Sequence, residues 1–240
     1  MILLLLFMLT MSANLQAQSL PDYFIPLRDA VYEQNLKAEQ IIPLYNAAKD
    51  KASSSLSGEE LYVVLSRCEY MMGRALLYEE RQDEAEFHFS EGMSLAEKAL
   101  KTDQRATGQR AAAWQMLAEN LSHLCTVRST AFVMANGLNV EKYSKNALAL
   151  NKRNAAAQYM VAARWVYAPS PFHNYKKGLE MMEAIIAESD MERDDRFNVY
   201  LSIGYAYMQQ KKFAEARPWF IKAQEVYPSN KYVQELLKKT

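Results

Sequence analysis

The chain has 240 residues, half of them hydrophobic, and its 28 basic residues balance its 28 acidic residues. This balance leaves no net field that would draw the protein to nucleic acid or to an anionic membrane surface, so we expect no nucleic-acid partner. Only 7 glycines and 7 prolines occur, which disfavours a turn-rich β fold and favours helices around a substantial core.

The first 17 residues have the features of a secretory signal peptide. Residues 2–11 are almost wholly apolar, too few to cross a bilayer comfortably, and the small-residue site Leu15-Gln16-Ala17 follows them. We therefore expect cleavage after Ala17, a periplasmic or secreted protein, and no stable membrane insertion of the mature chain. No Lys or Arg precedes the apolar run, so a second interpretation stays open, in which the run is a buried or membrane-retained helix.

Residues 18–57 are predicted to form an N-terminal capping helix and a linker. Apolar residues recur at helical spacing over residues 22–52, where Pro43 would bend the helix. The serine-rich run that follows is typical of a linker. Ser57, with Glu60 three residues later, predicts a capping box for the next helix.

The rest of the chain, residues 58–240, is predicted to form one domain of helical repeats. A glycine, an alanine and a phenylalanine recur at separations of twelve and four residues. This spacing occurs twice, in the set Gly73, Ala85 and Phe89 and in the set Gly204, Ala216 and Phe220. The small residues would let two antiparallel helices approach closely, and the phenylalanine would fill the gap beside the contact.

The apolar periodicity and the turn signals divide this domain into helices. The expected helices are 58–78, 83–101, a long one from about 104 to 134, one after the break Ala135-Asn136-Gly137 that Asn139 would cap, 154–167, 175–187, a pair within 197–228, and a polar closing helix over 230–238. The pattern therefore predicts about four helix pairs.

The stretch from Phe197 to Asn230 resembles the tetratricopeptide repeat (TPR). Its packing positions are filled by Tyr200, Ile203, Gly204, Tyr207, Phe213, Ala216, Phe220, Ala223 and Pro228. The resemblance extends over residues 58–228. It implies an all-α, TPR-like α-solenoid with flanking N- and C-terminal helices, acting as a non-enzymatic scaffold that binds a partner protein or peptide in its concave groove.

Two subgroups of this superfamily are also similar to the chain. One comprises exported repeat proteins that accompany the solute receptors of TRAP-type transporters. The other comprises microtubule-regulator-like repeat proteins, to which Ala163-Arg164-Trp165 and the proline-rich segment after it are similar. The first similarity implies an alternative function, in which the protein docks a periplasmic solute receptor or carries a small apolar solute.

In tetratricopeptide arrays the first helix of each pair lines the concave surface. If its small residue faces the partner helix, the positions six and three before it and one and four after it form one exposed stripe. From this stripe we predict a binding groove formed by Arg67, Tyr70, Arg74, Gln115, Glu119, Met160, Arg164, Tyr167, Tyr205 and Met208. Tyrosine, methionine and arginine are enriched where proteins bind peptides.

A structural interpretation of the stripe stays open beside the binding one. Arg74 or Arg164 would then pair with Glu119 and stabilise the stack, and the aromatic residues would pack against the N-terminal helix. The loop from Pro169 to His173 is a second candidate surface, in which Phe172 either projects as an apolar contact or packs into the core.

Catalytic and metal-binding chemistry finds no support in the sequence. The histidines His88, His123 and His173 lie in different predicted units, and His123 and Cys125 point in different directions on one helix. No glycine-rich phosphate loop or nucleophile elbow occurs. We therefore expect no enzyme, no cofactor and no metal site, and we expect Cys68 and Cys125 to be inert thiols.

Overall fold

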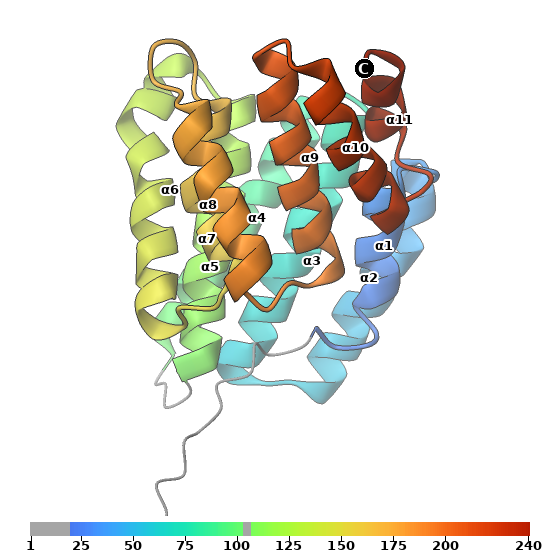
Figure 1. Cartoon of the computed structure of the whole chain (residues 1–240). Coiled ribbons are helices and arrows are strands. Elements are labelled where there is room, and N and C mark those ends of the chain that lie inside the picture. Colours follow the sequence, from blue (N-terminus) through green and yellow to red (C-terminus); the bar gives the residue numbers. More distant parts are fainter. Residues whose placement is uncertain (1–19, 103–106) are drawn as a thin grey trace, which may run out of the picture.

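The computed structural model describes residues 20–102 and 107–240, so the predicted signal peptide lies outside the described residues. Within these ranges the regular structure is helical, apart from one isolated bridge between Asn154 and Asp190. The helices are α1 (Ile25–Glu33), α2 (Ala38–Ser55), α3 (Gly58–Tyr78), α4 (Gln82–Lys101), α5 (Thr107–Val127), α6 (Thr130–Leu150), α7 (Ala155–Tyr167), α8 (Tyr175–Glu188), α9 (Arg193–Gln209), α10 (Phe213–Val226) and α11 (Lys231–Lys238) (Figure 1). Across the described ranges, every helix falls short of the length or apolarity that a membrane span requires.

Four antiparallel helix pairs stack side by side along the chain (Figure 1). They are α3 with α4, α5 with α6, α7 with α8, and α9 with α10. The helices α1 and α2 precede this stack, and α11 packs on α10 at its end. The prediction of an all-α solenoid of about four helix pairs with flanking helices is confirmed.

Two glycines set how closely the paired helices approach. A Cβ atom added to Gly73 would lie 2.7 Å from the ring of Phe89, and one added to Gly204 would lie 2.6 Å from the ring of Phe220. Both phenylalanines are fully buried. Because even one methyl group does not fit, the small residue lets the ring of the partner helix lie directly against the backbone. The recurring spacing in the sequence therefore has the predicted packing role.

The helix α1 closes the concave side of the stack. The first helices of the pairs, α3, α5, α7 and α9, contact one another in order, and α1 contacts both α3 and α9. These five helices form a ring, which Figure 1 shows from the side with α9 in front of α3. The inner face of the solenoid is therefore covered by α1 at the position where an open groove would lie.

Ion pairs and hydrogen bonds hold α1 against the last helix pair. Arg28, whose side chain is almost completely buried, lies 3.4 Å from a carboxylate oxygen of Glu192. Arg193, at the start of α9, donates to Asp29 over 2.8 Å, and the hydroxyl of Tyr227 donates to Asp29 over 3.1 Å. These ion pairs and this hydrogen bond therefore hold α1 against the last helix pair.

The N-terminal helices begin and end at places other than those predicted. The helix predicted over residues 22–52 is divided in two, because the chain turns at Gln34, which has a left-handed φ of 54°, and Pro43 lies inside the second helix, α2. The serine-rich run is helical up to Ser55, whose hydroxyl donates to the carbonyl of Lys51 over 2.6 Å. Ser57 does precede α3, but its side chain makes no capping hydrogen bond, so the predicted capping box is wrong.

The predicted break at residues 135–137 is also wrong, because this segment lies inside α6. The true break falls earlier, where Ser129 accepts a hydrogen bond from the backbone N–H of Phe132 and starts α6. Asn136 donates its side-chain amide to the carbonyl of Phe132 within the helix and does not end it. A single glycine in a helix costs only about 1 kcal/mol, which a serine cap and the packing of α6 on α5 outweigh.

Candidate functional site

Arg74 lies inside the ring and binds tyrosine hydroxyls. Its guanidinium donates to the hydroxyls of Tyr32 on α1 and Tyr78 on α3, and a third hydroxyl, on Tyr70, lies 3.5 Å away. The cation also lies 4.1 Å from the ring centroid of Tyr32. Arg74 is only 8% exposed, and among the described residues its hydrogen-bond partners are all hydroxyls. The site thus contains a buried positive charge without a directly bound carboxylate.

A second set of tyrosines faces the same interior from α7 and α9. The hydroxyl of Tyr167 lies 2.8 Å from the hydroxyl of Ser202, which in turn donates to Tyr159 over 3.2 Å. The rings of Tyr167 and Tyr205 lie 5.1 Å apart. Tyr232, at the start of α11, lines the same hollow as Tyr78.

We call these side chains the tyrosine cluster. It comprises Tyr32, Tyr70, Arg74, Tyr78, Tyr159, Tyr167, Tyr205 and Tyr232. Three of its members remain accessible, because Tyr78 is 41%, Tyr167 45% and Tyr232 47% exposed. Tyr78 and Tyr167 are the last residues of α3 and α7, so the cluster reaches solvent at the end of the ring where these helices finish.

An acid and a histidine on α5 lie beside the cluster. Burial raises the pKa of Glu119 to about 7, against the opposing charge of Arg67, and the amide of Gln115 donates to this carboxylate over 3.3 Å. Burial lowers the pKa of His123 to about 3. The His123 ring packs edge-on against Tyr70, with centroids 5.0 Å apart, so this neutral imidazole forms part of the wall.

The structure brings some of the predicted groove residues together and places others elsewhere. Tyr70, Arg74, Tyr167 and Tyr205 all belong to the tyrosine cluster. Arg74 packs on Tyr32 of α1, so the interpretation in which the stripe packs against the N-terminal helix describes this part of it. The same contact makes α1 a component of the site.

Arg67 and Gln115 lie toward the opposite end of the ring. With Asn154, Asp194 and Asp195 they line a cavity of about 70 Å³ at the start of α7 and α9. Burial raises the pKa of both aspartates, and the charge of Asp194 raises the pKa of Asp195 further. Acidic residues thus form part of its lining, and its volume is too small for a peptide segment.

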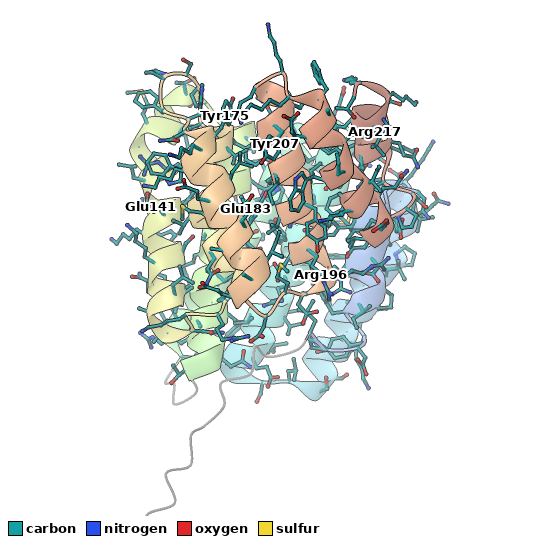
Figure 2. The ribbon with its side chains drawn as sticks, in the orientation of Figure 1. Glu141, Tyr175, Glu183, Arg196, Tyr207 and Arg217 are labelled. Carbon is teal, nitrogen blue, oxygen red and sulfur yellow. The ribbon has the colours of Figure 1, made fainter. Side chains whose placement is uncertain are left out.

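The remaining predicted residues lie outside the tyrosine cluster. Arg164 is exposed and forms an ion pair with Glu141 on α6. Glu141 is labelled at the left of Figure 2. The Arg164 guanidinium also lies 5.1 Å from the ring centroid of Trp165. Met160 is buried, and Met208 is half-buried against the main hydrophobic core. These side chains therefore support the stack in this structure.

Several members of the site were not singled out from the sequence. The stripe position four residues after Gly73 is Leu77, which packs on the core, whereas its neighbour Tyr78 belongs to the cluster. Tyr32 and Tyr232 belong to α1 and α11, outside the repeat register, so the spacing rule gave no reason to place them near α3. Phe172, in the loop before α8, projects into solvent and does not pack into the core.

A hollow of about 980 Å³ opens beside the exposed tyrosines. Its walls come from the α1–α2 connection, the end of α3 and the start of α11. We call it the end hollow. Its lining includes Leu36, Lys37, Tyr78, Lys231 and Tyr232. It is thus a large concave surface that reaches two members of the tyrosine cluster, Tyr78 and Tyr232, from outside.

Comparisons with known proteins add little about this site. No family model matches the chain, and no curated protein matches it. Among solved structures, the crystal structure of YrrB, described as a TPR protein with an unusual peptide-binding site, is similar over 91% of this chain and 91% of its own, with 16% identity and a TM-score of 0.39. At that identity and score the likeness carries no argument about function.

Proposed function

We propose that this protein is an exported, non-enzymatic scaffold that binds a partner protein or peptide at the tyrosine-lined end of its helical ring. The location outside the cytoplasm rests on the apolar N-terminal run and the small-residue site after it. The binding role rests on the accessible tyrosines around a buried arginine.

The observation that carries the proposal is the grouping of Tyr78, Tyr167 and Tyr232, all more than two-fifths exposed, at one end of the ring. Large aromatic side chains in contact with water at a single place are typical of interaction sites. Tyrosine also contributes a large contact area with few rotatable bonds, which limits the entropy lost on binding. The rigid helices behind these residues would hold them in place before a partner arrives.

The closure by α1 determines how a partner would enter. Because α1 contacts both α3 and α9, an extended segment cannot cross the concave face as it would in an open solenoid. A partner would instead approach the exposed end of the ring. The alternative of a small apolar solute inside the stack has less support, because hydroxyls and a guanidinium line this interior.

Site-specific photo-cross-linking tests this proposal. Tyr167 would be replaced by p-benzoylphenylalanine in the full chain, and the protein would be expressed in the cell envelope and irradiated. Phe213, on α10, is 45% exposed like Tyr167 and provides a matched control position. We expect a defined cross-linked partner from position 167 and not from position 213, because only the former belongs to the tyrosine cluster.

Two results would contradict the proposal. Equal cross-linking from both positions would show nonspecific contact, and the absence of any adduct from position 167 would remove the exposed tyrosines as a binding surface. Identification of the adduct by mass spectrometry would also separate a peptide-bearing partner from a solute receptor.

A further inference from the structure

We propose that two copies of this chain associate through the N-terminal half of α6, about a two-fold axis that passes between Met134 and Ala135. The occupant of this surface is thus a second copy of the same protein. The inference is independent of the proposed function, because α6 contributes no residue to the tyrosine cluster. It rests on the burial, the shape and the charges of α6.

The N-terminal half of α6 is apolar but is not buried. The structure buries two of the 21 residues of α6, Ser144 and Ala147, whereas it buries ten of the 21 residues of α5. Every residue from 130 to 143 is at least partly accessible, and Met134 is 82% and Leu138 70% exposed. In Figure 1, α6 forms the left edge of the molecule. An apolar helix surface of this kind is typical of an interface.

The charges around this surface favour a second copy as the occupant. No charged side chain occurs from residue 129 to residue 140, and the chain as a whole has no net charge. Two copies can therefore approach without repulsion between like charges. A bilayer surface is a less suitable occupant, because helices that lie on membranes are rich in lysine and arginine on their polar face, and this segment contains neither.

The exposed side chains match their own copy when the two helices run antiparallel. Ala131, Met134, Ala135 and Leu138 are all exposed, and their spacings of three and four place them on one side of α6. We call these four residues the α6 face. With the axis between the two central residues, Met134 faces Ala135 of the second copy and Leu138 faces Ala131 of the second copy. Each large side chain then meets a small one, which lets the helices approach closely.

Opposite charges meet at both ends of the same arrangement. Arg128, just before α6, lies opposite Glu141 of the second copy, and the two-fold axis repeats this pair at the other end. Within one chain Arg128 pairs with Glu86 over 2.8 Å, and Glu141 pairs with Lys145 over 2.7 Å and with Arg164. The second copy would therefore extend these ion pairs into a network across the interface.

Sedimentation equilibrium of the full chain tests the inference. The overlap is short, about ten residues of each helix, so we expect a weak dimer with a dissociation constant on the order of 10 µM. Met134→Glu should raise this constant roughly 30-fold, because two new carboxylates would lie side by side at the axis. Since the Met134 side chain is exposed in one chain, circular dichroism should show an unchanged helix content.

A matched pair of alanine substitutions on α6 tests the antiparallel arrangement. Ala131→Glu should weaken the dimer, because the new carboxylate would face Leu138 of the second copy. Ala149→Glu is the control, since Ala149 is an exposed alanine of the same helix beyond the overlap. It adds the same charge and should leave the dissociation constant unchanged.

Three results would overturn the inference. The first is a wild-type protein that stays monomeric at about 200 µM, well above the expected dissociation constant; binding of that monomer to phosphatidylglycerol vesicles would instead assign the α6 face to a membrane. The second is a dimer that Met134→Glu leaves intact, which would place the interface elsewhere. The third is an equal effect of Ala131→Glu and Ala149→Glu. The cross-linking experiment at position 167 tests the proposed function separately from all three.

Discussion

Glu119 is an interior group whose charge changes near neutral pH. Burial raises its pKa from 4.5 to about 7, although the charge of Arg67 opposes this shift. The folded protein therefore holds the proton more tightly than the unfolded chain. The resulting stability is fully present below the unfolded pKa and is lost as the pH rises through about 7.

Replacement of this acid by its neutral isostere should remove that pH dependence. Glu119→Gln should gain stability relative to the wild type as the pH rises from 5.5 to 8, measured as the difference in urea midpoint. The lowered pKa of His123 acts in the opposite direction, but both proteins contain His123, so its effect cancels in the difference. Glu188→Gln, at an exposed position on α8, is the control and should show no such trend. A constant difference across this pH range would contradict the assignment.

At the scale of the helix, two glycines should respond in opposite ways to the same substitution. Gly204→Ala should destabilise the protein by about 1–3 kcal/mol, because the new methyl group meets the Phe220 ring at 2.6 Å. Gly137→Ala should stabilise it by about 0.5–1 kcal/mol, since the nearest atom, on Val133, lies at an ordinary contact distance of 3.6 Å. Chemical denaturation of both variants measures these changes.

A further substitution identifies the cause of the loss at Gly204. Phe220→Leu in the Gly204→Ala background should recover part of the lost stability, because the smaller side chain leaves room for the methyl group. Additive losses in the double variant would show that the two residues do not share the close contact.

The helices whose packing follows a local rule were predictable from the sequence. The contact of Gly73 with Phe89 is fixed by residues close together in the chain, so spacing alone located α3 and α4. The boundary between α5 and α6 was missed because a serine cap at Ser129 carries a weaker sequence signal than a glycine at Gly137. The position of a helix boundary depends both on its cap and on tertiary packing, and the repeat spacing does not show which of the two determines it.

At the scale of the whole molecule, Asp29 joins three partners that close the ring. It accepts from Arg28 over 2.8 Å, from Arg193 over 2.8 Å and from the hydroxyl of Tyr227 over 3.1 Å. We expect Asp29→Asn to destabilise the fold by about 1–3 kcal/mol, because two guanidinium groups each lose one of their anionic acceptors. Thermal and urea unfolding would measure the loss.

An exposed ion pair provides the matched control. Asp190 pairs with Arg153 at the surface, so Asp190→Asn should leave the unfolding midpoint unchanged within error. Equal effects of the two substitutions would show that the Asp29 network does not hold α1 in the ring.

The candidate site was predictable only where it lies on the repeats. The stripe rule found Tyr70, Arg74, Tyr167 and Tyr205, because one helical register places them on the inner face. It could not find Tyr32 or Tyr232, whose positions depend on contacts between the two ends of the chain. Asn230, just before α11, donates to the carbonyl of Tyr32 across 198 positions in sequence, and no local pattern encodes such a pairing.

The closure by α1 also bears on the order in which the protein takes shape. Arg28 and Tyr32 leave the ribosome early, yet Glu192 and Asn230 follow them by 164 and 198 positions. Bringing such distant segments together costs entropy, and only the contacts that form once both segments are present offset this loss. During synthesis α1 therefore lacks its final partners, and the ring closes late, after the C-terminal segment of the chain has been made.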